Sequence, residues 1–229
     1  MTRVFSDRYG APAKLDECAE HGPRAGAELF VVEGDSAAAA VASVRDPRFQ
    51  AVFAMQGKPL NATRAARGKV EAHPVFGPLA AALGTGLEAA CDPRRARYDR
   101  VLVLTDPDAD GIHCGFLVLL FFHRWMRPLL DAGKVEVVRP PWGEVVAAGG
   151  EIQLAFSEPE LVALADRGRA AGAIAVRRYR GLAAVDGGLL HETCLAAATR
   201  RTTRVSAGEV AAMIELVDAL EPEGPEPAA

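Results

Sequence analysis

The feature that most constrains the fold of this 229-residue chain is a series of short, mostly apolar runs separated by helix-forming stretches. The runs lie at residues 29–32, 51–55, 101–104 and 135–138. A short apolar run without alternating polar residues is typical of a strand that is buried on both faces of a parallel sheet. Strands of this kind that alternate with helices predict an α/β fold, with a parallel sheet flanked by helices.

Helices are predicted in the stretches between these strands, at 36–44, 62–70, 78–83 and 111–130. The glycines of Gly84-Thr85-Gly86 are expected to end the third of these helices. Beyond Trp142 the pattern changes, because short apolar strands at 145–147 and 173–176 flank a helix-like stretch at 159–170. This change predicts a small C-terminal α+β appendage on the parallel sheet.

The predicted organisation therefore has four parts: an irregular lead-in at 1–25, the α/β domain at 26–142, the appendage at 143–220 and a tail at 221–229. The tail consists of Glu, Pro, Gly and Ala, so it cannot bury enough apolar surface to fold and is expected to be disordered.

Composition excludes several classes of protein. The net charge of −4 gives no overall basic field that would draw the chain onto nucleic acid or an anionic membrane. The four cysteines are widely spaced without a C-x-x-C pair, which favours free thiols over a zinc site or a disulfide framework. The N-terminus lacks an apolar signal sequence, and the run at 116–122 is far shorter than the ~20 residues of a membrane span. We therefore expect a cytoplasmic protein with no membrane contact.

Acidic residues follow two of the predicted strands directly. Glu33 comes after the first strand, and Asp106, Asp108 and Asp110 come after the third. The carboxyl ends of parallel strands meet at one edge of a sheet, where open α/β folds bind their ligands. Two carboxylates about 4 Å apart repel by roughly 4 kcal/mol at an effective dielectric of ~20. A hard divalent cation such as Mg²⁺ would relieve this repulsion, so the acidic residues predict a metal centre.

Three other interpretations of the Asp triplet compete with a metal centre. A solvated turn that caps the following helix needs fewer than three aspartates. An EF-hand loop also begins D-x-D-x-D-G, but it follows a helix and needs Glu at its twelfth position, which is Leu117 here. A haloacid-dehalogenase-type phosphatase would make Asp106 a nucleophile and Asp108 an acid. That interpretation does not account for Glu33, and it stays a minority alternative.

Several motifs in order carry a family resemblance. They are Leu-Phe-Val-Val-Glu-Gly-Asp-Ser-Ala at 29–37, Met-Gln-Gly-Lys-Pro-Leu-Asn at 55–61 and Thr-Asp-Pro-Asp-Ala-Asp-Gly-Ile-His at 105–113. Together they resemble the Toprim domain, and more closely the B-subunit family of type IIA DNA topoisomerases, which includes gyrase B and ParE. The resemblance extends to Arg-Tyr-Arg-Gly-Leu at 178–182 and covers roughly residues 12–205. It implies a parallel Toprim, or Rossmann-like, sheet.

The resemblance also implies roles for individual residues. Glu33 would be a metal ligand and the general acid/base, and Asp106, Asp108 and Asp110 would hold one or two Mg²⁺ ions, with Mn²⁺ or Ca²⁺ as substitutes. The residues that would face DNA are Lys58, Asn61, His113, Arg178, Tyr179 and Arg180.

By resemblance, the chain is expected to be an Mg²⁺-binding Toprim subunit of a type IIA DNA topoisomerase, an isomerase. It would support cleavage and religation of double-stranded DNA by a tyrosine on a partner A subunit. The chain carries no ATP-binding motif, so we expect no ATPase activity in it, and a separate ATPase chain is a further candidate partner. Gln56 stands where a basic residue is usual, and 182–185 depart from the family's Leu-Gly-Glu-Met. Two alternatives stay open: a non-catalytic regulatory module that binds DNA or the A subunit, and a stand-alone Toprim nuclease.

Overall fold

The computed structural model describes residues 14–170, 172 and 175–220. Its centre is a six-stranded sheet in the order β1-β3-β2-β4-β5-β9. The strands are β1 (Leu15–Asp16), β2 (Glu28–Glu33), β3 (Gln50–Met55), β4 (Arg100–Leu104), β5 (Val135–Val138) and β9 (Thr202–Arg204). The four inner strands are parallel, and β1 and β9 are antiparallel edges. The predicted α/β fold with a mostly parallel sheet is confirmed.

Helices cover both faces of this sheet, as a parallel sheet requires. Alternate residues of β2 enter different cores: Leu29 and Val31 belong to one cluster, and Phe30 and Val32 to the other. The first face is covered by α3 (Arg67–Glu71), α4 (Phe76–Leu83), α5 (Ala109–Trp125), α6 (Arg127–Asp131) and α9 (Ala207–Leu220). The second face is covered by α2 (Gly34–Val44) and α8 (Gly187–Leu190).

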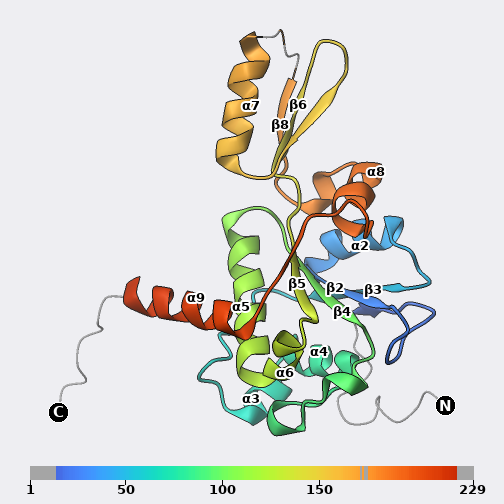
Figure 1. The fold of residues 1–229 in the computed structure, drawn as a ribbon, viewed down its shortest axis with the longest axis vertical. Helices are drawn as coiled ribbons and strands as arrows, with labels where there is room; N and C mark the ends of the chain where they lie inside the picture. Colours follow the sequence, from blue (N-terminus) through green and yellow to red (C-terminus); the bar gives the residue numbers. More distant parts are fainter. Residues whose placement is uncertain (1–13, 171, 173–174, 221–229) are drawn as a thin grey trace.

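A second, smaller sheet stands at the top of Figure 1, away from the central sheet. It is antiparallel in the order β7-β6-β8, from β6 (Gly143–Val146), β7 (Ile152–Ala155) and β8 (Ala175–Arg178). The helix α7 (Glu158–Ala170) packs on it through Leu161, Leu164 and Ala165. After β8 the chain returns to the central sheet and adds β9 and α9 to it.

Two predicted helices differ from the observed ones. Of the stretch 62–70, only 67–70 is helical, and the carbonyl of Ala62 instead accepts a hydrogen bond from the indole nitrogen of Trp125 at 2.9 Å. The predicted helix 111–130 is broken at Met126 into α5 and α6. Pro128 explains this break, because proline lacks the amide hydrogen that would continue the helical ladder and its ring clashes with the preceding turn.

The prediction that Gly84 ends a helix is confirmed, since Gly84 caps α4 with a left-handed φ of 71°. Short helical turns complete the fold, namely η1 (Glu88–Ala90), η2 (Pro93–Arg95), η3 (Leu182–Ala184) and η4 (His191–Leu195). Within the part of the chain that the structure describes, no helix has the length and apolar character needed to cross a membrane. The predicted disordered tail at 221–229 lies outside the described residues.

Candidate functional site

The candidate site lies at the carboxyl ends of β2 and β4. These strands are parallel neighbours with Val32 paired to Leu104, so Glu33 and Asp106 leave the sheet at the same edge. Glu33 is also the N-cap residue, directly before α2 begins at Gly34. The thiol of Cys114, on α5, donates to Glu33 Oε1 at 3.6 Å. The other oxygen, Oε2, is buried without a hydrogen-bond partner, which is costly for a carboxylate and leaves it free to receive a cation.

Burial and mutual repulsion disturb both of these carboxyl groups. Burial is the largest cause that raises the pKa of Glu33, and the neighbouring Asp106 raises it further. Burial also raises the pKa of Asp106, with a smaller contribution from Asp108, while a hydrogen bond from the backbone amide of Leu182 acts in the opposite direction. The negative potential at these two carboxyl groups therefore favours a bound cation.

The other two aspartates are engaged differently. Asp108 Oδ1 accepts a hydrogen bond from the Gly111 amide at 2.8 Å and so caps α5. Asp110 has a side chain that is 84% exposed, and its Oδ1 lies 3.5 Å from the ammonium of Lys58. Among the described residues, no three His, Cys, Asp or Glu side chains are gathered closely enough to enclose an ion.

The donor set still fits Mg²⁺. This ion keeps several waters and is commonly bound through one or two carboxylates together with substrate phosphates. Glu33 supplies a free buried oxygen, and Asp106 lies close enough to perturb its pKa. Asp108 and Asp110 add negative charge beside them.

Glycine is required where the Asp triplet turns into α5. A Cβ on Gly111 would lie 2.2 Å from the carbonyl oxygen of Asp106, a distance no real Cβ tolerates. The absence of a side chain lets the helix begin directly over the end of β4. This explains why the acidic run is followed by Gly111.

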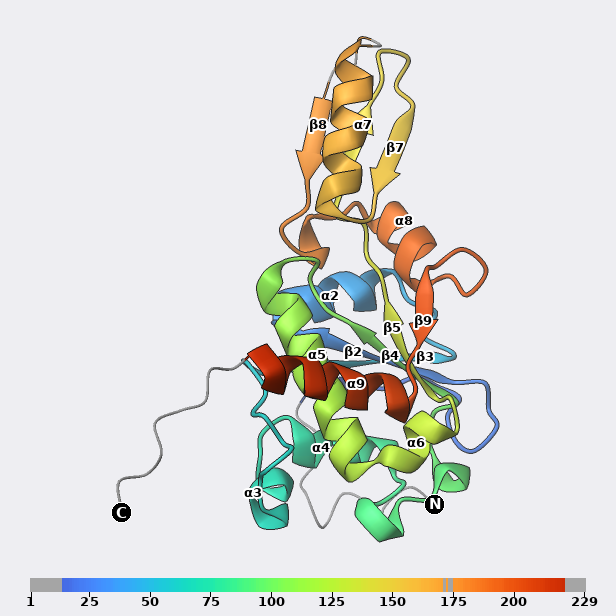
Figure 2. The same ribbon diagram turned by 60° about the vertical axis from the view of Figure 1, so that its left-hand side comes forward.

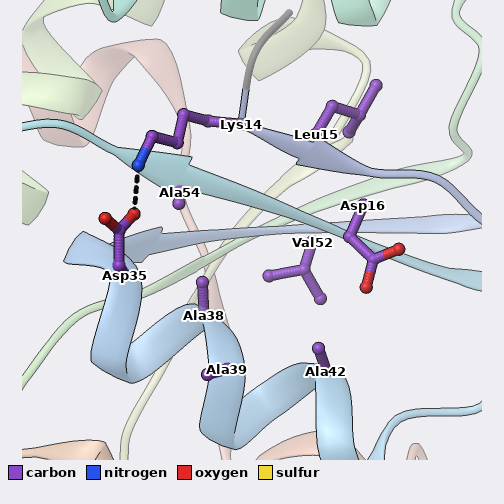
Figure 3. A pocket seen from close by; sticks show the side chains of 9 residues that line it. All are labelled: Lys14, Leu15, Asp16, Asp35, Ala38, Ala39, Ala42, Val52 and Ala54. Atoms are coloured by element: carbon purple, nitrogen blue, oxygen red, sulfur yellow. Dashed lines mark hydrogen bonds and ion pairs between the residues drawn. The ribbon is translucent and has the colours of Figure 1, made fainter.

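We call the edge of the sheet that carries Glu33, Asp106, Asp108 and Asp110 the acidic edge. Asp35 belongs to the Glu33-Gly34-Asp35 signature but lies apart from it. Figure 3 shows its carboxylate turned towards Lys14, with which it forms an ion pair. The pair borders a shallow hollow of about 310 Å³ that is lined by β1, β3 and the alanine-rich face of α2. Of the first acidic signature, therefore, only Glu33 faces the Asp triplet.

The residues predicted to face DNA are distributed over two regions. Lys58 and His113 are exposed beside the acidic edge, and Lys58 reaches Asp110. Asn61 is exposed in the same loop as Lys58, and its Oδ1 accepts hydrogen bonds from Thr63.

The basic run that begins at the last residue of β8 is the second region, and one of its residues corrects the prediction. Arg178 and Arg180 are exposed, and the guanidinium of Arg178 lies 4.7 Å from the centre of the Trp142 ring. Tyr179, in contrast, is only 8% exposed, and its hydroxyl donates to Glu144 Oε2 at 2.6 Å. Its ring packs in the core, so it has no free face to offer DNA.

A mostly apolar cavity of about 640 Å³ adjoins the acidic edge and was not predicted. It lies among the end of β4, α5, β5, β9, the start of α7 and α9, and Asp106 forms part of its wall. Ile112 on α5 and Leu216 on α9, both 62% exposed, border it. No motif could reveal this cavity, because its walls come from segments far apart in the sequence.

Comparison with known proteins agrees with this architecture. Residues 28–140 match the family model described as the Toprim domain. The B subunit of DNA gyrase from Streptococcus pneumoniae serotype 4 is 36% identical over 226 residues, covering 94% of this chain and 34% of the relative. The corresponding gyrase chain from Mycolicibacterium smegmatis is 34% identical, over 94% of this chain and 32% of its own length.

The gyrase B chain from Thermotoga maritima is 35% identical over 195 residues, which cover 85% of this chain and 30% of the relative. The chain thus spans about a third of the length of the curated relatives that it matches. Residues 28–140 of this chain are a Toprim domain, and the chain belongs with the Toprim-containing part of the DNA gyrase B family.

Proposed function

We propose that this chain is the Mg²⁺-binding Toprim module of a type IIA DNA topoisomerase. It would serve cleavage and religation of double-stranded DNA by a tyrosine on a partner A subunit. The observation that carries the proposal is the free, buried oxygen of Glu33 beside Asp106. The similarity to gyrase B supports the reaction class.

The chain's own residues would act in three ways. Glu33 and Asp106 would hold Mg²⁺, and Asp108 and Asp110 would strengthen the negative potential that attracts it. When bound, the ion would stabilise negative charge on the scissile phosphate and on the leaving 3′ oxygen. Glu33 has a raised pKa and a buried oxygen, which suits a group that gives up and takes back a proton during the reaction.

Exposed cations would position the DNA backbone. Lys58 lies at the acidic edge and forms an ion pair with Asp110. A DNA phosphate could replace the Asp110 carboxylate as the partner of Lys58. Arg178, at the end of β8, and Arg180, just beyond it, are exposed and would contribute phosphate contacts that carry no sequence preference.

A cleavage assay tests the proposal. The chain, a purified gyrase A subunit and supercoiled plasmid would be combined with and without Mg²⁺, and protein-linked breaks would be counted after denaturation. We expect Mg²⁺-dependent breaks that Glu33→Gln reduces at least a hundredfold, which is the scale for loss of a general acid/base.

Asp35→Asn is the matched control, because Asp35 lies in the same sequence signature but faces Lys14. Its breaks should equal those of the unaltered chain. A Glu33→Gln variant that produces as many protein-linked breaks as Asp35→Asn would refute the proposal.

A regulatory, non-catalytic module is the second candidate. The exposed apolar side chains of α5 and α9 beside the cavity favour it, since such surfaces often mark protein contacts. It predicts association with the A subunit that is unaffected by Asp108→Ala or by chelators, without any breaks. A stand-alone nuclease would instead nick plasmid when the A subunit is omitted.

A further inference from the structure

We infer that the Gly181–Leu182 backbone is a positioning element for the Asp106 carboxylate. It fixes the orientation in which Asp106 meets a divalent cation. The inference rests on the proposed function for the identity of the cation, but the contact itself does not depend on any metal.

The first observation is a hydrogen bond between distant parts of the chain. The amide nitrogen of Leu182 donates to Asp106 Oδ1 at 2.8 Å, across 76 positions of sequence. Because Leu182 belongs to a segment far from β4, this bond fixes the direction of Oδ1 independently of the strand that leads into Asp106. Bonds of an amide to a carboxylate are roughly twice as strong as those between neutral groups.

The second observation concerns the space at Gly181. A Cβ built there would lie 2.9 Å from Asp106 Oδ2 and 3.2 Å from Cγ. The backbone of Gly181 is extended, with φ −169° and ψ 167°, which any residue can adopt. A side chain at this position would therefore displace the Asp106 carboxylate, although the backbone conformation itself does not require glycine.

The third observation is that this backbone is itself held firmly. The side chain of Leu182 is buried in the core of the second sheet face. On the other side of Gly181, the amide of Tyr179 donates to the carbonyl of Trp142 at 2.9 Å, and the Tyr179 hydroxyl donates to Glu144. The segment that leaves the small sheet is thus anchored on both sides of the contact with Asp106.

Together these contacts place Asp106 between two fixed backbones. Gly111 closes over its main chain from α5, and Gly181 and Leu182 hold its side chain from η3. Residues that orient a metal ligand in this way commonly change metal affinity by about 10–100-fold when they are altered.

The test measures Mn²⁺ binding to the metal-free chain by electron paramagnetic resonance, alongside thermal unfolding. Gly181→Ala should weaken Mn²⁺ binding at least tenfold while the chain stays folded. Gly149→Ala is the matched control, since a Cβ there meets nothing within 4 Å. Equal affinity of Gly181→Ala and Gly149→Ala would overturn the inference.

A second pair of variants separates the amide from the side chain. Leu182→Pro removes the donor at the first position of a helical turn, where proline is tolerated. Leu182→Ala keeps the donor and loses the packing of the buried side chain. We expect Leu182→Pro to bind Mn²⁺ at least tenfold more weakly than Leu182→Ala, and the reverse order would contradict a positioning role.

Amide exchange without metal distinguishes failure of this inference from failure of the proposed function. In EDTA, the Leu182 amide should exchange at least tenfold faster in Asp106→Ala than in the unaltered chain. If the chain binds no Mn²⁺ but this difference is found, the metal proposal fails and the positioning contact stands. If the Leu182 amide exchanges at the same rate in both, the contact is refuted whatever the metal result.

Discussion

Glu33 is the residue at which the demands of folding and of metal binding conflict most directly. One of its oxygens accepts a bond from Cys114, and the other is buried and unpartnered. Burial and Asp106 both disfavour its charged form. Groups of this kind reduce the stability of the empty protein and are characteristic of functional sites.

Neutralising Glu33 should therefore stabilise the metal-free chain. We expect Glu33→Gln to raise Tm in EDTA by about 2–4 °C, which corresponds to about 1 kcal/mol for a chain of this size. Mg²⁺ should raise the Tm of the unaltered chain, by linkage, and leave the variant unchanged. Differential scanning calorimetry with Asp35→Asn as control checks both effects, and a lower Tm for Glu33→Gln in EDTA would contradict the explanation.

At this scale the sequence predicted the two residues that share the acidic field, because strand ends in a parallel sheet converge. The DNA-facing role predicted for Lys58 stays a prediction, and its ion pair with Asp110 at the acidic edge came from the tertiary structure. The sequence failed for Tyr179, since an exposed basic run gave no sign that the ring between two arginines turns inward to Glu144.

Among the elements, a buried charged cluster fastens the returning C-terminal segment to the sheet. Arg200, which follows η4, donates to Glu28 Oε2 at 2.7 Å and to the carbonyl of Leu195 at 3.0 Å. Gln50 Nε2 donates to the same two acceptors. The cluster therefore joins the starts of β2 and β3 to the chain that leads into β9.

Removal of Arg200 should take its closest cation away from the buried Glu28 carboxylate, leaving it the Gln50 amide and the more distant Arg100, 3.8 Å from Oε1. We expect Arg200→Ala to lower the free energy of unfolding by about 3–5 kcal/mol, because the Arg200 side chain is only 2% exposed. Arg169→Ala, which removes an exposed pair with Asp166, should cost less than about 1 kcal/mol. Urea unfolding measures both, and similar losses for the two variants would show that the cluster does not fasten the segment.

Elements were predicted where their signal is local and were missed where it is not. The inner strands were found because each contains a mostly apolar run and they alternate with helices along the chain. The edge strand β9 is Thr-Thr-Arg and is exposed at each residue, so only pairing with β5 makes it a strand. The prediction of one long helix over 111–130 was wrong at Met126, because the apolar pattern continues through the break that Pro128 introduces.

At the scale of the whole molecule, burial of cysteine and tyrosine side chains should make the folded state less stable at alkaline pH. All four cysteines are buried, and burial raises the pKa of each, to about 11 for Cys18, Cys114 and Cys194. Burial also raises the pKa of Tyr98 and Tyr179. The folded chain thus holds these protons to higher pH than the unfolded chain does.

Stability should accordingly be level between pH 8 and about pH 9 and fall from there towards pH 11. The sign follows because, above the ordinary thiol pKa of 9.0, the unfolded state binds fewer protons than the folded state. Tyrosines add to the fall from about pH 10. Urea midpoints measured between pH 8 and 11 check this, and a midpoint that is level or rises across that range would refute it.

The sequence alone determined the α/β class, the inner strands and the acidic edge, because each follows from residues adjacent in the chain. Tertiary structure decided what long-range contacts create: the edge strands, the cavity beside α9 and the hold of Leu182 on Asp106. Local apolar pattern specifies which segments must be buried, whereas the partner that buries each one depends on packing across the entire chain. The acidic edge could therefore be predicted from the sequence, but the Gly181–Leu182 backbone that orients the Asp106 carboxylate could not.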